Sequence, residues 1–212
     1  MPAIIKTEVF TFDELSDDAR DRARAWCSEG ALDYDWWSFV YDDFSSICKI
    51  LGIDLKTRPV RLMGGDTRRK PCIQFSGFCS QGDGASFEVD LYAYARNSLT
   101  QIKAHAPNDR ELHDIAARLN AIQRRNFYQL YARVDQRGRY VHENTMQVDV
   151  RRDDAEMTAD AGDTITEAMR DLARWLYRQL QSEYDHLTSD ESVEDGIIAN
   201  EYTFTEAGRR FG

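Results

Sequence analysis

A hairpin with a glycine-rich tip is the sequence feature that most constrains how this chain can fold. Residues 73–92 (IQFSGFCSQGDGASFEVDLY) alternate apolar and polar side chains on both sides of a polar tip. This alternation is typical of half-buried β-strands, and a glycine-rich turn between two such runs predicts an antiparallel pair. The tip consists of five residues: Ser80, Gln81, Gly82, Asp83 and Gly84. It is interpreted either as a tight turn that needs the positive φ angles of glycine or as a contact site for a ligand or partner.

Further strands and a series of amphipathic helices complete the predicted elements. Residues 58–63 and 71–79 are expected to form strands around an arginine-rich turn. Residues 127–134 and 139–150 are expected to form another hairpin. In the strand after the tip, Phe87, Val89 and Leu91 are expected to share one face. Apolar residues recur at helical spacing in further segments: about 17–29, 33–51, 98–106, 109–122, 164–187 and 189–200.

These elements together predict an α+β fold. Hairpins place consecutive strands in antiparallel order, and the strand patterns have one apolar and one polar face. We therefore expect an antiparallel sheet built from hairpins and covered on one face by helices, in a single domain over residues 1–212. Residues 8–12 (EVFTF) and 201–206 (EYTFTE) are similar in pattern, and we expect them to be neighbouring strands.

The chain is acidic, with 37 Asp and Glu residues, 27 Lys and Arg residues and a net charge of −10. A negative protein repels a phosphate backbone, so we expect no direct binding of nucleic acid. Acidic residues gather at 153–167 and 183–195, and neither run contains Lys or Arg. The first run supplies a predicted acidic face: Asp153, Asp154, Glu156, Asp160 and Asp163. Such a run is either a solvated surface or a binding surface for a basic partner.

Basic and aromatic residues supply the other candidate binding positions. Lys and Arg residues gather between positions 56 and 70, and Arg68 and Arg69 are expected to contact an anion together with the glycine-rich tip. Tyr128 and Tyr131 are expected on opposite faces of one strand. One of the two tyrosines is therefore expected to face solvent or a partner.

Motifs that carry metal binding, nucleotide binding or nucleophilic catalysis do not occur in the sequence. The four cysteines show no Cys-x-x-Cys spacing, and no two histidines lie three or four residues apart. Neither a Walker-type phosphate loop nor a Gly-x-Ser-x-Gly elbow is present. We therefore expect no metal, no cofactor and reduced thiols. A non-enzymatic role is the leading interpretation, and catalysis stays an open question.

The sequence also lacks the features that direct a chain to or through a membrane. No apolar run reaches the length of about 18 residues that a spanning helix needs. The first residues (MPAIIKTE) have neither the basic region nor the apolar run of a secretory signal. We expect no membrane contact and a cytoplasmic location, while the oligomeric state is left open.

Four segments resemble a group of small acidic proteins encoded by bacteriophages and prophages, some of which are labelled antitoxins of toxin–antitoxin systems. The segments are residues 14–20 (ELSDDAR), 33–37 (DYDWW), 75–87 (FSGFCSQGDGASF) and 127–131 (FYQLY). This chain has Glu88-Val89 where such proteins often have Glu-Gly. The resemblance implies a phage or prophage setting inside a bacterial host cell, and it assigns no catalytic residues.

Two functional hypotheses follow. The leading one is a phage or prophage accessory protein, either antitoxin-like or an anti-defence inhibitor, that occludes a host or toxin protein without catalysis. Its acidic face, or its tip with nearby aromatics, would dock on a basic and possibly nucleic-acid-binding surface of that protein. The alternative is a protein that binds or sequesters a nucleotide-like small molecule, or a weak hydrolase, with the tip and arginines contacting the anion.

Overall fold

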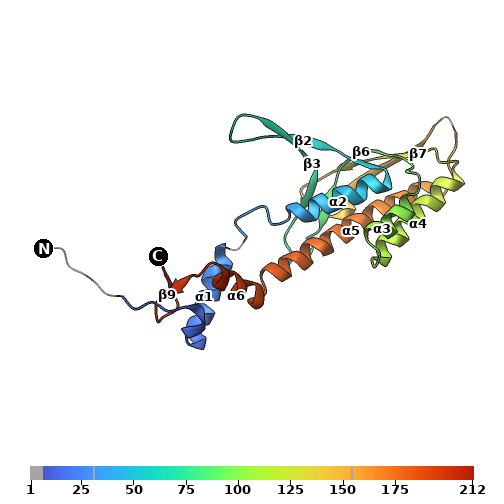
Figure 1. Ribbon diagram of the computed structural model, residues 1–212. Helices are drawn as coiled ribbons and strands as arrows, with labels where there is room; N and C mark the ends of the chain where they lie inside the picture. The colour runs from blue at the N-terminus through green and yellow to red at the C-terminus, as the bar shows by residue number, and fades with distance from the viewer. Residues whose placement is uncertain (1–6, 31, 154) are drawn as a thin grey trace. The chain divides into compact units, whose positions relative to one another are not determined.

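The structure is a computed structural model that describes residues 7–30, 32–153 and 155–212. The chain divides into two compact units (Figure 1). Unit 1 comprises Met1–Trp37 and Gln181–Gly212, and unit 2 comprises Ser38–Leu180. Helices and antiparallel strands are both present, so the predicted α+β class is confirmed. That the whole chain folds as a single domain stays a prediction, which equilibrium unfolding tests.

The main sheet of unit 2 is antiparallel, with the strand order β1-β6-β7-β8. Its strands are β1 (Ile53–Leu55), β6 (Val89–Tyr92), β7 (Leu130–Gln136) and β8 (Met146–Arg152). Along β7, Leu130, Ala132 and Val134 are buried, whereas Arg133 and Asp135 are exposed. This alternation confirms the prediction of one buried and one exposed face, because side chains along a strand point to opposite sides.

Helices of unit 2 cover the buried face of the sheet (Figure 1). They are α2 (Ser38–Leu51), α3 (Ser98–His105), α4 (Arg110–Arg125) and the part of α5 (Ala161–Leu187) up to Leu180. The predicted apolar stripes are buried as expected; Phe44 of α2 packs edge-on against Phe87 with ring centroids 5.1 Å apart. Asp109 caps α4 by accepting a 2.9 Å hydrogen bond from the Leu112 N–H. Its other carboxylate oxygen accepts one of 2.7 Å from the Trp175 indole.

Two more hairpins branch from the main sheet at a single junction. Strands β2 (Thr57–Arg61) and β3 (Thr67–Pro71) pair with each other, and so do β4 (Ile73–Phe75) and β5 (Ala85–Phe87). One residue separates each pair of consecutive strands at the junction, namely Lys56, Cys72 and Glu88. The Lys56 N–H donates to Glu88 (2.9 Å), the Glu88 N–H to Cys72 (3.0 Å), and the Cys72 N–H to Lys56 (2.7 Å), in each case to the carbonyl. This ring of hydrogen bonds satisfies the backbone where three strands change partners.

Several predicted boundaries in unit 2 are wrong, each for a local reason. Helix α2 begins at Ser38 instead of about Asp33, because residues 32–37 form turns and bends. Leu91 is exposed and Tyr92 is buried, since the pairing of β6 with β7 shifts register between Val89 and Tyr92. Strand β8 begins at Met146 instead of residue 139, because a loop with a short 3-10 helix, η2 (Glu143–Thr145), precedes it.

Unit 1 is built around helices α1 (Asp17–Gly30) and α6 (Asp190–Ala199). It also contains the 3-10 helix η1 (Phe12–Glu14), the last residues of α5, and the short strands β9 (Thr203–Phe204) and β10 (Arg210–Phe211). Its core consists of seven buried residues: Phe12, Leu15, Ala19, Ala23, Val193, Ile197 and Phe204. Phe10 and Phe204 exchange two 2.8 Å backbone hydrogen bonds, which confirms that the similar first and last segments are neighbours. The predicted strand 8–12 is reduced to this single bridge because η1 begins at Phe12.

Within the described ranges, no helix combines the length and the apolar character that crossing a membrane requires.

Two glycines, one in each unit, test whether the chain unfolds as one domain. A Cβ on Gly52 (φ +80°) would lie 2.2 Å from the Ala93 carbonyl oxygen, and one on Gly208 (φ +75°) would lie 2.2 Å from the Ala19 carbonyl oxygen. We expect Gly52→Ala and Gly208→Ala each to lower the free energy of unfolding by about 3 kcal/mol. Urea unfolding followed by tryptophan fluorescence and circular dichroism measures this loss.

Two control glycines separate the effect of the Cβ clash from the effect of a positive φ angle. Gly65 (φ +90°) and Gly138 (φ +97°) also have positive φ angles, but a Cβ there meets no atom within 4 Å. Alanine at these controls is expected to cost only about 1 kcal/mol. If the chain is one domain, both clashing variants shift the same single transition. Two separate transitions, each moved by only one variant, would contradict the single-domain prediction.

Candidate functional site

The net negative charge of the chain comes from unit 1. Its ranges contain 17 acidic and 6 basic residues, a balance of −11, whereas unit 2 contains 20 acidic and 21 basic residues, a balance of +1. The acidic run at 183–195 is part of this unit, but the run at 153–167 is not. The net negative charge is therefore concentrated in unit 1, although the total for the whole chain does not reveal this.

Helices α1 and α6 carry a large part of this charge on one packed pair. Their acidic residues are Asp17, Asp18, Asp21 and Glu29 in α1, and Asp190, Glu191, Glu194 and Asp195 in α6. Ala19 and Ala23 of α1 share the buried core with Val193 and Ile197 of α6. Arg24 pairs with both Asp21 and Glu194, so it links the two helices and compensates two of the eight carboxylates.

A groove of about 730 Å³ lies between residues of α1 and α6 and the closing strands. Aromatic and apolar side chains line it together with polar groups: Trp26, Cys27, Glu29, Gly30, Tyr34, Leu187, Ser192, Val193, Gly196, Asn200, Tyr202 and Arg210. The ring of Trp26 meets that of Tyr202 edge-on at 5.4 Å. The Arg210 guanidinium lies 5.0 Å from the Trp26 ring centroid and 4.5 Å from that of Tyr202. These cation–π contacts hold the aromatic wall in place.

Two glycines leave the groove open. A Cβ added to Gly30 or to Gly196 would meet no atom within 4 Å, so side chains there would project into free space. Gly196 lies inside α6, where glycine is less favourable than other residues by about 1 kcal/mol. A residue that is poor for the helix yet opens the groove is the kind of local inconsistency expected at a binding site.

The chemistry of the groove suits binding more than nucleophilic attack. Trp, Tyr and Arg are the residues that contribute most to the energy of protein interfaces. Cys27 is the thiol that lines the groove, and burial raises its pKa, which lowers the fraction of reactive thiolate. In the part of the chain that the structure describes, no three His, Cys, Asp or Glu side chains gather closely enough to hold a metal ion.

The predicted tip lies in the loop between β4 and β5 of unit 2, and its composition has structural causes. The Asp83 carboxylate accepts hydrogen bonds from the N–H groups of Cys79 (3.1 Å) and Ser80 (2.7 Å). Gly82 has a φ angle of +102°, which favours glycine. A Cβ on the buried Gly84 would lie only 3.1 Å from the Cα of His142. Ser80, Gln81 and Gly82 remain exposed, so the tip is a preformed surface turn.

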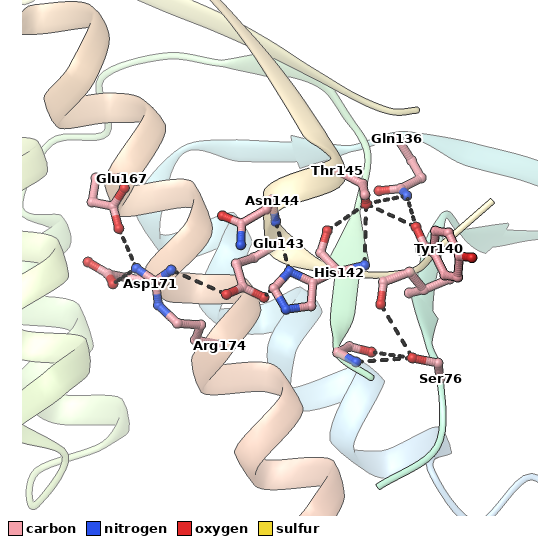
Figure 2. A network of polar contacts seen from close by, with 12 residues as sticks. Ser76, Gln136, Tyr140, His142, Glu143, Asn144, Thr145, Glu167, Asp171 and Arg174 are labelled. Atoms are coloured by element: carbon pink, nitrogen blue, oxygen red, sulfur yellow. Dashed lines mark hydrogen bonds and ion pairs between the residues drawn. The ribbon is translucent and has the colours of Figure 1, made fainter. Parts of the chain in front are cut away.

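A network of polar contacts braces this tip against the loop before β8 (Figure 2). The Ser76 hydroxyl accepts from the Gly84 N–H at 3.0 Å and donates to the Val141 carbonyl at 3.3 Å. His142, which we expected in a strand, instead caps η2, and its Nδ1 accepts from the Asn144 N–H at 3.2 Å. All of these hydrogen bonds join groups within unit 2, so the network has a structural role.

A chain of ion pairs extends the same network to α5 and α4. Glu143 lies 3.5 Å from Arg174, which also pairs with Glu167 and Asp171 (Figure 2). Asp171 in turn pairs with Arg118 of α4. Asp171 is the most informative of these groups, because it is partly buried and accepts from two arginines.

The remaining predicted positions are spread over unit 2. Arg68 and Arg69 lie on β3, and among the described residues no hydrogen bond or ion pair joins them to the tip. Tyr128 precedes β7 with a φ angle of +63°, so it does not share a strand with Tyr131, and it packs against Tyr94 with ring centroids 4.4 Å apart. Tyr131 lies near Asp153, whose charge raises the pKa of Tyr131.

The predicted acidic face is partly compensated. Arg125 donates two hydrogen bonds to Asp160, of 2.7 and 3.0 Å, and holds the pKa of Asp160 below its ordinary value. Asp153, Glu156 and Asp163 are exposed, and Asp154 lies outside the described residues. The sequence analysis did not identify the groove of unit 1, because its lining comes from both ends of the chain. The acidic run at 183–195 was the one signal that pointed toward it.

A family model described as a domain of unknown function, DUF8835, matches residues 36–190. The chain belongs to this family. The DUF8835 match contains all of unit 2, whereas α1 and nearly all of α6 lie outside it. The groove of unit 1 is therefore formed mainly by residues beyond the matched range. No curated protein and no solved structure matches the chain.

The Asp171 ion pairs predict how the protein responds to acid. Burial alone would raise the pKa of Asp171, but hydrogen bonds and charges from Arg118 and Arg174 outweigh it and lower the pKa. A carboxylate with a lowered pKa stabilises the fold above the unfolded-state pKa of about 4, and this contribution is lost as pH falls through the folded-state pKa. We expect Asp171→Asn to cost about 1–3 kcal/mol at pH 7 and to flatten the stability profile between about pH 5 and 2.

Asp163→Asn is the matched control, since Asp163 is an exposed carboxylate at the start of the same helix. It should leave both the stability at pH 7 and the acid limb close to wild type. The urea unfolding midpoints of wild type and both variants, measured at pH 7 and between about pH 5 and 2, test this expectation. An Asp171→Asn variant with the acid sensitivity of wild type would contradict the proposed role of the ion pairs.

Proposed function

We propose that this DUF8835 protein is a non-catalytic binding protein that occludes a basic surface of a partner protein. Unit 1 is the proposed binding surface, because it carries the net negative charge of the chain and also contains an open aromatic groove. The resemblance to phage and prophage proteins supports an accessory role, antitoxin-like or as an anti-defence inhibitor, in the cytoplasm of a bacterial host. A target that itself binds nucleic acid is a natural candidate, because such a surface is basic.

The acidic helices and the groove contribute different parts of the binding free energy. Exposed carboxylates attract a basic partner over a distance and raise the association rate, and salt weakens this attraction. The groove supplies the short-range part, since an apolar side chain that enters it contacts Trp26, Tyr202 and Val193. A groove between two helices suits the apolar face of an amphipathic helix. The proposed ligand is therefore a basic amphipathic helix with an apolar anchor.

The alternative function, binding of a nucleotide-like anion or weak hydrolysis at the tip, has less support. It needs the arginines and the tip to converge on one anion. Arg68 and Arg69 belong to the β2–β3 hairpin, the tip belongs to the β4–β5 loop, and Asp83 uses its carboxylate within the tip.

Gly196→Leu tests the groove without disturbing the core. The new side chain would occupy the groove, and the loss of glycine from α6 favours the helix. The probe is a fluorescein-labelled amphipathic helical peptide rich in Lys and Leu with one Trp, and fluorescence anisotropy measures its dissociation constant. We expect Gly196→Leu to weaken binding at least about tenfold, which is about 1.4 kcal/mol, with an unfolding midpoint no lower than that of wild type.

Charge reversal tests the electrostatic contribution to partner binding. Glu191→Lys with Asp195→Lys changes exposed residues of α6, and Asp90→Lys with Asp114→Lys makes the same change in charge on exposed residues of unit 2. The first pair is expected to slow association and to reduce its salt dependence, whereas the second pair leaves both near wild type. Equal effects of the two pairs, or an affinity independent of salt, would overturn the proposal.

Co-purification of tagged wild type and tagged Gly196→Leu from a bacterial host then identifies the natural partner. The expected partner is a basic protein that wild type retains and the groove-filled variant loses.

A further inference from the structure

The β2–β3 hairpin is a basic arm that the proposed function of unit 1 does not use. It spans residues 57–71 and projects from the junction of unit 2 (Figure 1). Between Lys56 and Pro71 the sequence has six basic residues and a single acidic one, Asp66. We propose that this arm binds duplex DNA by lying in a groove between the two phosphate backbones.

The register of the hairpin places positive charge on both of its faces. Arg58 pairs with Lys70 and Val60 with Arg68 on one face, and Pro59 pairs with Arg69 and Arg61 with Thr67 on the other. A hairpin that docks on a flat acidic protein surface needs cations on one face only. A ribbon inside a groove has a phosphate backbone on each side, and cations on both faces match that arrangement.

Most of these cations are available to a ligand. Arg58, Arg61 and Arg68 are exposed, and among the described residues none of them forms an ion pair with a carboxylate. Arg69 instead folds along the ribbon, donating to the Thr57 hydroxyl at 2.7 Å and to its carbonyl at 3.1 Å. Three uncompensated guanidinium groups on a narrow ribbon have no structural function of their own.

The end of the arm carries two apolar side chains that are exposed to solvent. Leu62 is 45% exposed and Met63 is 108% exposed, and they lie next to the turn at Gly64 and Gly65. The Leu62 N–H donates to the Asp66 carbonyl at 2.7 Å, which closes the turn. Proteins that bend DNA insert such apolar side chains, including Met and Leu, between base steps. An exposed Met at the end of a cationic ribbon fits this chemistry.

The shape of the arm and the charge balance of unit 2 agree with this ligand. Two-stranded ribbons bind in the major or the minor groove, and the minor groove is the one in which apolar wedges act. The expected absence of nucleic-acid binding rested on the net charge of the whole chain, but unit 2 has a balance of +1 and the negative charge is in unit 1. The arm belongs to unit 2, so the charge balance of unit 2 describes its setting better than the average over the whole chain. In this proposal the arginines contact phosphates, which carry no sequence information, so the binding is expected to be independent of sequence.

The test uses the full chain and a fluorescein-labelled 30-base-pair DNA duplex of mixed sequence, with anisotropy measured from about 50 to 300 mM NaCl. Arg61→Gln with Arg68→Gln removes two cations from the arm. This double variant should weaken binding at least about tenfold at low salt and reduce the slope of log K against log salt by about 2. Met63→Ala should keep the slope and reduce the DNA bending that end-labelled duplexes report by energy transfer.

Arg133→Gln with Arg139→Gln is the matched control, because it removes two exposed cations of unit 2 that lie off the arm. It should bind DNA within about twofold of wild type. No DNA binding at 50 mM NaCl, or an equal loss in this control, would overturn the proposal. Binding to polyglutamate or to a second copy of the chain as tight as to the duplex would assign the arm to an acidic protein surface instead. Gly196→Leu should bind DNA as wild type does. The DNA-binding proposal for the arm and the partner-binding proposal for the groove of unit 1 can therefore be rejected independently.

Discussion

The ring of three backbone hydrogen bonds among Lys56, Cys72 and Glu88 is the constraint on which unit 2 depends. At each of these residues a strand leaves one partner and takes another, so the main sheet, the basic arm and the tip hairpin all start at the same place. The Lys56 ammonium also pairs with Glu88 at 2.7 Å and Asp135 at 3.1 Å, which ties the junction to β7 and raises the pKa of Lys56. The direction of the arm and the position of the tip are consequences of this junction.

Two kinds of surface result from how the fold distributes charge. Unit 1 has two acidic helices that contribute to a groove with an aromatic wall, and the β2–β3 arm of unit 2 presents arginines on both faces. The DUF8835 match includes the arm but leaves out most of the groove. A basic protein segment is the proposed ligand of the first surface and a DNA duplex that of the second.

Much of the fold could be predicted from local sequence patterns, because those elements depend on interactions between near neighbours in the chain. The stripe of α4 and the Asp109 cap depend on residues within two turns of the same helix, and the β7–β8 alternation depends on neighbouring residues. The errors have longer-range causes. The register shift that buries Tyr92 arises from pairing with a strand some forty residues away, and the glycine at position 84 is explained by the approach of His142.

The sequence alone determined the class of the fold, the hairpins, most of the helices and the total charge, because each depends on spacing between near neighbours or on composition. The tertiary structure alone decided where that charge lies, how two hairpins and the main sheet share one junction, and which residues line a groove. Trp26 and Tyr202 are far apart in the chain, and only packing brings their rings to 5.4 Å. Burial and contact between distant residues are properties of the folded chain, and no local pattern contains them.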